Sequence, residues 1–237
     1  MNEAARIGIL GGTLDPIHLG HMDAALVARE ALHLDRVIIV PAHVPPHRSR
    51  PDTSPYHRFA MAALAVNGVE GLIVSDMELD APGPSYTADT LLRLRDRSGL
   101  TASQIFFITG ADAFAEIETW SRYPGVLDLA NFVVVSRPGA ALGDLRRQLP
   151  QLKDRMRLPL ATHRSFEGGD SKTTIFLVDA PTTDASSTEI RRRIAAGESV
   201  AGLVPPMVEQ HIRQHGLYEQ SSLSAFRADH LHGQNRA

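Results

Sequence analysis

Short runs of β-branched and other apolar residues recur along this 237-residue chain, with helical patterns between several of them. Runs of this kind are typical of strands that are buried on both faces. In a parallel sheet, helices that pack on both sides of the sheet bury the strands in this way. The pattern therefore predicts an α/β fold with a doubly wound parallel sheet. The predicted strands are Ile7 to Leu10, Val37 to Val40, Ile105 to Thr109, Phe132 to Val135 and Ile175 to Val178. The predicted helices are Leu19 to Leu32, Pro55 to Val66, Thr87 to Arg97, Thr188 to Ala196 and Pro206 to His215.

The length and apolar content of the chain favour one domain. With 237 residues, 43% of them hydrophobic, the chain can bury a single sizeable core. We expect this domain over residues 1–218 and a flexible polar tail over residues 219–237. Residues 140–172 are rich in arginine, glycine and polar residues, and we expect a helix there followed by an irregular surface segment. The pair His230 and His232 in the tail is interpreted as incidental, not as a metal site.

Charge and residue usage exclude several classes of function. The chain has no cysteine, so disulfides, thiol catalysis and cysteine-ligated zinc are excluded. The sequence shows no apolar leader region and no apolar run near the ~20 residues of a membrane span, so we expect a cytoplasmic protein without a membrane partner. The net charge of −3 argues against binding to nucleic acid. None of these features predicts an oligomeric state.

The segment IGILGGTLDPIHLGH, from Ile7 to His21, places a glycine-rich turn between a strand and a helix start. Glycine lets the backbone approach a ligand without a Cβ in the way, and a helix N-terminus offers N–H groups and a positive dipole end to an anion. His18 and His21 are three residues apart, so both imidazoles can face one phosphate. The segment therefore predicts a nucleotide-phosphate site, whereas the ordinary alternative is a turn followed by a helix cap.

This segment resembles the GGTFDPxHxGH signature of nucleotidyltransferases with an HxGH motif, relatives of the class I aminoacyl-tRNA synthetases. Leu14 stands where the signature usually has Phe, a change that we expect to alter packing more than chemistry. The resemblance implies a Rossmann-like nucleotidyltransferase fold that uses ATP. By the same resemblance, the residues of this segment that bind ATP are Gly11, Gly12, Thr13, His18 and His21.

A second segment, Ser186 to Arg191, has the sequence SSTEIR. By itself it predicts a helix start with a hydroxyl cap and an early acidic residue, and most such strings only cap a helix. It is also similar to the ISSTxIR motif of the same family, although Ala185 stands where that motif usually has Ile. The similarity implies that Ser187, Thr188 and Arg191 contact the triphosphate, and that Arg191 assists His18 and His21 in catalysis.

Several shorter segments follow predicted strands or open a predicted helix. Each has a purely structural alternative, such as a rigid Pro-Pro loop, a helix cap or a tryptophan packed in the core. Their order along the chain resembles that of the bacterial nicotinate-nucleotide adenylyltransferases. The segments are Pro45-Pro46-His47-Arg48, Ser85 to Thr90, Gly110-Ala111-Asp112, Thr119-Trp120 and Ser136 to Gly139.

The resemblance implies a binding site for the acceptor, nicotinate mononucleotide. His47 and Arg48 would bind its phosphate, and Asp112 a ribose hydroxyl. Trp120 would stack on the pyridine ring, while backbone groups around Tyr86 and Thr87 would receive the carboxylate. Arg137 is a further candidate for a phosphate contact.

The implied reaction is transfer of AMP from ATP to the 5′-phosphate of the mononucleotide, with release of pyrophosphate. The nucleophile is already an anion, so the site needs positioning and charge neutralisation but no general base. Mg²⁺ is expected with ATP, held mainly by phosphate and water, with no metal site built by the protein. Two alternatives stay open: a related transferase acting on phosphopantetheine, and a nucleotide-binding regulatory protein without catalysis.

Overall fold

Seven parallel strands form one sheet in the order β3-β2-β1-β4-β5-β7-β6 in the computed structural model, which describes residues 5–46, 51–81, 83–136, 142–159 and 173–219. From β1 the chain moves outward to β3, and from β4 it moves outward in the other direction. The order therefore reverses between β1 and β4, where ligands bind in folds of this class. The strands are β1 Ile7–Gly12, β2 Arg36–Pro41, β3 Leu72–Val74, β4 Ile105–Gly110, β5 Asn131–Val135, β6 Met156–Arg157 and β7 Ile175–Val178.

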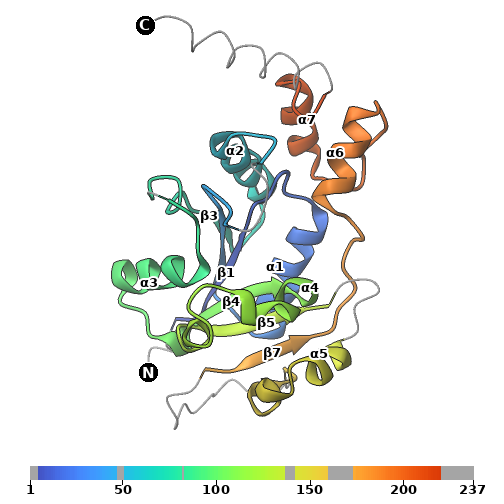
Figure 1. Ribbon diagram of the computed structural model, residues 1–237. Coiled ribbons are helices and arrows are strands. Elements are labelled where there is room, and N and C mark those ends of the chain that lie inside the picture. Colours follow the sequence, from blue (N-terminus) through green and yellow to red (C-terminus); the bar gives the residue numbers. More distant parts are fainter. Residues whose placement is uncertain (1–4, 47–50, 82, 137–141, 160–172, 220–237) are drawn as a thin grey trace, which may run out of the picture.

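Helices cover both faces of this sheet (Figure 1). One apolar cluster joins the sheet to α1, α2, α6 and α7. A second cluster joins the opposite face to α3, α4 and α5. The doubly wound parallel fold is confirmed. The helices are α1 Leu19–Ala31, α2 Pro55–Val66, α3 Thr87–Ser98, α4 Ala111–Ala115, α5 Leu142–Gln148, α6 Ser187–Ala195 and α7 Pro206–Gln214, and short 3-10 turns connect several elements.

Strand β4 shows why nearly continuous apolar runs predict this sheet. Phe106 and Ile108 belong to the cluster with α1, whereas Ile105 and Phe107 belong to the cluster with α3. Successive side chains point to opposite faces of a strand, so a strand covered on both sides needs an apolar residue at every position. Gly8 in β1 marks close packing between strands, because a Cβ there would lie 2.8 Å from Cγ2 of Val37.

The predicted strands and helices are all present, with ends that match or differ by at most two residues. The helix expected within residues 140–172 is confirmed as α5, while residues 160–172 lie outside the described part of the chain. The sequence analysis did not predict β3, β6 or α4. These elements have three, two and five residues, too short for an apolar period to appear, and β3 and β6 are the two edges of the sheet.

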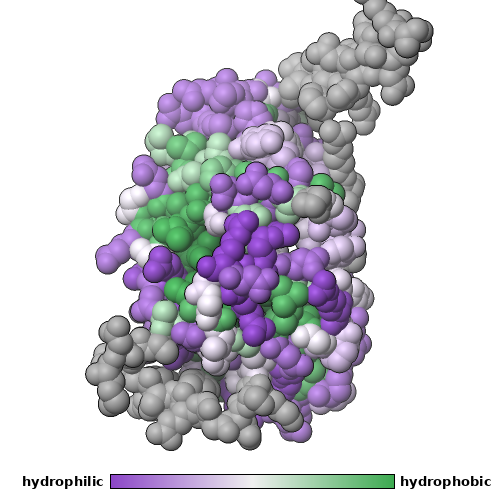
Figure 2. Space-filling model, turned by 90° about the vertical axis from the view of Figure 1, so that its left-hand side faces the viewer, coloured by the Kyte–Doolittle hydropathy of each residue, from purple (hydrophilic) through white to green (hydrophobic). Residues whose placement is uncertain are grey.

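The β3 edge is only partly covered. Ile73 on this strand keeps 42% of its surface exposed. On the side of the molecule shown in Figure 2, hydrophobic patches lie between hydrophilic ones, as on most globular domains. In the described part of the chain, no helix has the length and apolar character needed to cross a membrane.

Candidate active site

A cavity of about 540 Å³ opens at the carboxyl ends of β1 and β4, where the strand order reverses. The residues after β1 line it together with the N-termini of α1, α3 and α6 and the start of α4. Every predicted site residue in the described part of the chain lies in its wall. These residues are Gly11, Gly12, Thr13, His18, His21, Tyr86, Thr87, Asp112, Trp120, Ser187, Thr188 and Arg191.

The two histidines of the first motif lie at the start of α1. His18 is the N-cap residue, and the ring centroids of His18 and His21 are 3.7 Å apart in a stacked arrangement. The backbone N–H of His18 donates to Nδ1 of His21 at 3.3 Å, so a neutral His21 ring carries its proton on Nε2. A Cβ on Gly20 would lie 2.9 Å from the carbonyl oxygen of Thr183. The glycine between the histidines therefore lets the chain before α6 pass close to this helix start.

A buried carboxylate holds the loop between β1 and α1. Asp15 is 3% exposed, and its side chain accepts hydrogen bonds from Asp52 N at 2.8 Å, Thr53 Oγ1 at 2.6 Å and Tyr218 Oη at 2.7 Å. Burial raises the pKa of Tyr218, so this phenol stays protonated and remains a donor. One side chain thus connects the first loop to the segment before α2 and to the segment after α7.

A buried arginine fixes the ends of β1 and β2. Arg58 on α2 is fully buried, and its guanidinium donates to the carbonyl oxygens of Thr13 at 2.8 Å, His43 at 3.0 Å and Ala42. Burial lowers the pKa of Arg58, and the charge of Asp15 is the largest influence that opposes this shift. A guanidinium remains charged in proteins, so it puts positive charge behind the cavity wall as well as fixing the backbone.

Helix α6 is tied to the same loop. Ser187 Oγ donates to the carbonyl oxygen of Pro16 at 2.9 Å, and Arg191 Nη1 donates to that of Asp15 at 2.8 Å. Arg191 Nε also lies 2.7 Å from Oδ2 of Asp52. The helix begins at Ser187, one residue before the predicted start, because Ser186 caps it by accepting from the N–H of Glu189. The two sequence motifs therefore meet directly.

The opposite end of the cavity is formed by the start of α3 and the segment before it. Tyr86 is the N-cap residue of α3, and its N–H donates to the carbonyl oxygen of Pro84 at 3.2 Å. Thr87 is the first helical residue, and an N–H at that position has no acceptor within its own helix. Of the two predicted backbone donors, Thr87 is therefore the better placed to receive an anionic group.

A second buried carboxylate lies behind α3. Glu78 is 5% exposed and accepts a hydrogen bond from Thr90 Oγ1. Burial raises the pKa of Glu78, although hydrogen bonds from Ser85 and Thr90 oppose this shift. Ser85 Oγ also accepts from the N–H of His43 at 2.9 Å, which links this end of the cavity to the segment after β2.

Trp120 packs in the core and also faces the cavity, so its position agrees with both roles considered for it. Its ring meets Phe107 edge to face at 5.9 Å between centroids and also contacts Phe132, so part of it packs in the core. The residue is only half-buried and also lines the cavity, so the rest of it faces the site. Asp112 lies in the first turn of α4, beside the same part of the cavity.

Comparison with known proteins supports one family. Residues 9–193 match the model of the cytidylyltransferase-like family. A probable nicotinate-nucleotide adenylyltransferase of Roseiflexus sp. is 42% identical over 219 residues, which cover 91% of this chain and 99% of that protein. Another from Desulfatibacillum aliphaticivorans is 38% identical over 224 residues, covering 90% of this chain and 99% of that relative. The chain belongs to the cytidylyltransferase-like family, among the nicotinate-nucleotide adenylyltransferases.

Solved structures of this family have the same fold. The nicotinic acid mononucleotide adenylyltransferase of Plasmodium falciparum, solved in a complex with NaAD, superposes with a TM-score of 0.68 at 17% identity, covering 90% of this chain and 97% of that one. The same Plasmodium protein in a complex with APC gives a TM-score of 0.66 at 16% identity, with the same coverage. The Rossmann-like nucleotidyltransferase fold expected from the motifs is thereby confirmed.

Three predicted site residues and three unpredicted ones complete the description of the site. His47, Arg48 and Arg137 lie outside the described residues. The sequence analysis missed Asp15 and Glu78, which line the cavity, and Arg58, which supports its wall from behind. One signal was available for Arg58, because it is a charged residue on the otherwise apolar face of α2.

Proposed function

We propose that this chain transfers AMP from ATP to nicotinate mononucleotide in the cytoplasm, giving nicotinate adenine dinucleotide and pyrophosphate. One observation carries the proposal: the N-termini of α1 and α6 meet at one end of a single cavity, and Thr87 and Trp120 line the other end. The first end suits a triphosphate, and the second suits a flat ring with a carboxylate. The names of the curated relatives agree with this pairing of substrates.

His18, His21 and Arg191 are the proposed catalytic residues, and the glycine-rich turn with Thr13, Ser187 and Thr188 completes the ATP site. The stacked imidazoles at the start of α1 would stabilise negative charge as it develops on the reacting phosphates. Arg191 uses Nε and Nη1 in its contacts with Asp52 and Asp15, but a guanidinium has five N–H groups. Because Arg191 lines the cavity, its other N–H groups can bind phosphate oxygens.

The reaction then needs no proton transfer from the nucleophile. The phosphate of the mononucleotide would attack the α-phosphorus of ATP in line, a P–O bond would form, and the bond to pyrophosphate would break. Charge moves toward the bridging oxygen of the leaving pyrophosphate, where donors held in advance by the fold lower the barrier. The imidazoles, the guanidinium and the helix N-termini of this cavity are such donors.

The acceptor would lie at the end formed by α3 and α4. Trp120 offers the exposed part of its ring to the pyridine, Asp112 bonds a ribose hydroxyl, and the carboxylate is received at Thr87 beside Tyr86. His47 and Arg48 would bind the phosphate of the mononucleotide, with Arg137 as an additional contact. These last three roles rest on the sequence motifs.

Mg²⁺ would accompany ATP, bound mainly by phosphate and water. The carboxylates at the phosphate end agree with this arrangement, because both already have partners in the protein. Asp15 accepts hydrogen bonds from Thr53 and Tyr218, and Asp52 forms an ion pair with Arg191. The donors lining this end are imidazole, guanidinium and N–H groups, which bind phosphate oxygens, whereas Mg²⁺ prefers oxygen ligands. When bound, the metal would neutralise part of the triphosphate charge.

The test is an assay of pyrophosphate release with ATP, Mg²⁺ and a panel of acceptors: nicotinate mononucleotide, its amide counterpart and phosphopantetheine. We expect turnover with nicotinate mononucleotide and the matching dinucleotide as product. Efficient turnover of phosphopantetheine instead would overturn the acceptor assignment. ATP binding without release of pyrophosphate for any acceptor would show a regulatory protein.

A further inference from the structure

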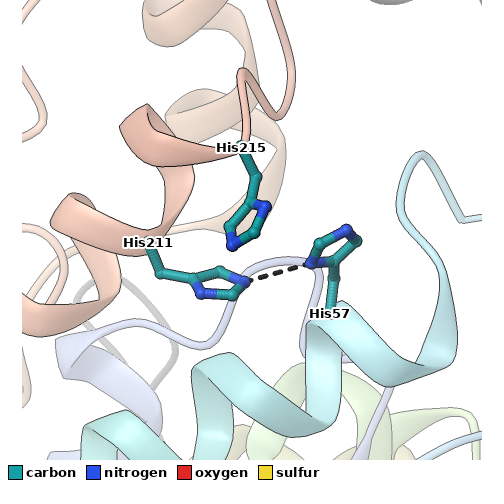
Figure 3. A group of neighbouring side chains, drawn as sticks. All are labelled: His57, His211 and His215. Carbon is teal, nitrogen blue, oxygen red and sulfur yellow. Dashed lines mark hydrogen bonds between the residues drawn. The ribbon is translucent and has the colours of Figure 1, made fainter.

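Three histidines from two helices gather away from the cavity (Figure 3). His57 lies in the first turn of α2, His211 in the last turn of α7, and His215 at the C-cap of α7. One ring nitrogen of each lies within 4.8 Å of the corresponding atoms of the other two. Nδ1 of His57 and Nε2 of His211 lie 3.1 Å apart. Figure 3 shows the three rings converging on the space between the two helices.

The fold holds these side chains together for local reasons. His211 and His215 are four residues apart and share one side of the α7 end. Val208 and Ile212 anchor α7 in the same apolar cluster that contains Met61 and Ala65 of α2. The N–H of His57 donates to Oγ of the N-cap residue Ser54, which fixes the first turn of α2. The backbones of the α7 end and of the first turn of α2 are therefore fixed, so the three rings can move only by side-chain rotation.

The cluster has the composition and spacing of a transition-metal site. Three nitrogens bound at about 2.05 Å in tetrahedral geometry lie roughly 3.3 Å from one another. Separations of 3.1 Å for one pair and at most 4.8 Å for the others can reach that value by small rotations of the rings. The cluster offers only imidazole ligands, which suit Zn²⁺ and its neighbours and do not suit Mg²⁺ or Ca²⁺.

The degree of burial of the three rings suits a metal site. His57 and His211 are half-buried where α2 packs against α7. His215 is exposed, which gives an ion a path from solvent and leaves room for a water molecule as fourth ligand.

We propose that His57, His211 and His215 bind one divalent cation of the late first transition series, with Zn²⁺ as the best fit. None of the three lines the active-site cavity, so this proposal does not depend on the proposed function. The bound ion would join the end of α7 to the start of α2. The chain continues from His215 to Tyr218, whose hydroxyl donates to Asp15, so the ion would also steady the support of the phosphate loop.

The experiment is a titration of the full chain, freed of metal with a chelator, with Zn²⁺ in an isothermal titration calorimeter. We expect one site per chain that Mg²⁺ does not occupy. His211→Gln, which replaces a ligand with a neutral polar side chain, is expected to weaken binding by at least tenfold. His215→Gln alters an exposed residue and provides a second test if the first variant folds poorly.

Thermal unfolding gives an independent measurement. At a free Zn²⁺ concentration one hundred times Kd, we expect the Tm of the unaltered chain to rise by about 5–10 °C. The rise should be largely absent in both ligand variants. No rise in the unaltered chain would overturn the proposal, because an ion that joins two helices of the folded state must stabilise that state.

Matched controls separate this site from the other histidines. His33→Asn alters an exposed histidine with a φ of 48°, a conformation that asparagine tolerates. The double variant His230→Asn and His232→Asn removes the histidine pair of the C-terminal region, and His21→Asn breaks the stacked pair of the cavity. All three controls should keep the tight site. If a control loses it while His211→Gln and His215→Gln keep it, the ion binds elsewhere and the proposal is wrong.

Discussion

The two ends of the cavity are built differently. At the phosphate end, the side chain of Asp15 accepts three hydrogen bonds, and Arg58 holds the ends of two strands through their carbonyl groups. At the acceptor end, Thr87 and Trp120 are partly exposed and belong to separate segments of the chain. The groups at the phosphate end are held in place before any substrate binds. At the acceptor end, Thr87 and Trp120 make their remaining contacts only when the substrate is bound.

Substitutions at the two ends should therefore change the kinetics in different ways. Donors that the fold already orients stabilise charge in the transition state, so their loss should lower turnover. Groups that contact only one substrate contribute uniform binding, so their loss should raise the KM of that substrate. Four measurements can test this division of the cavity into two ends.

The largest effect is expected at the stacked histidines. His18→Ala and His21→Ala should each lower kcat by about 10²–10³-fold, because each removes a donor aimed at developing charge. The KM for ATP should change much less. Steady-state kinetics measures both values, and circular dichroism checks that each variant is folded. Near-normal turnover in either variant would remove that histidine from the mechanism.

The next largest effect concerns the choice of acceptor. Nicotinate mononucleotide should be used ten- to a hundredfold more efficiently than its amide counterpart, measured as kcat/KM. Trp120 can stack on either ring, so it cannot discriminate between them. The start of α3 can, because N–H donors and a positive dipole end favour a carboxylate, while an amide would turn an NH₂ group toward a donor. Equal efficiency with both acceptors would contradict this account and leave adenylyl transfer standing.

Arg191 and Arg48 test whether the two ends act separately. Arg191→Ala removes a proposed catalytic donor that also binds ATP, so it should lower kcat and raise the KM for ATP roughly tenfold, while the KM for the mononucleotide changes little. Arg48→Ala should raise the KM for the mononucleotide and change that for ATP little. Asp52→Asn is the control for Arg191, because it removes the charge that Arg191 faces and keeps the arginine. If Asp52→Asn reproduces the effect of Arg191→Ala, the arginine acts only by holding that loop. If both arginine variants lose the same substrate, the division into two ends is wrong.

Sequence reasoning recovered most of the fold and cavity wall because their signals are local. The period of apolar residues predicts the five longer strands, and the two motifs contain their own helix caps and glycines. Asp15, Arg58 and Glu78 were not found, because their roles depend on partners far along the chain: Asp15 on Tyr218, and Arg58 on Thr13. The cluster of His57, His211 and His215 was missed for the same reason, since only the packing of α7 on α2 brings it together.

The smallest effect is expected at Glu78, a buried carboxylate that lines the acceptor end of the cavity. Burial raises the pKa of Glu78, so the folded state holds the proton more tightly than the unfolded state. Its contribution to stability is therefore complete below pH ~4.5 and is lost as pH rises through the folded pKa. Glu78→Gln keeps an oxygen acceptor for Thr90 and removes the titration.

The measurement is urea unfolding of both proteins at a series of pH values. The free energy of unfolding of Glu78→Gln minus that of the unaltered chain should grow from pH ~4.5 upward and then level off. The growth should be about 1.4 kcal/mol for each unit by which folding raises the pKa, less some screening by solvent. Glu70→Gln, at an exposed position, should show no such trend. A difference that stays constant or shrinks with pH would mean that Glu78 is not held as a buried acid. The acceptor end would then lack the kind of buried support that Asp15 and Arg58 give the phosphate end.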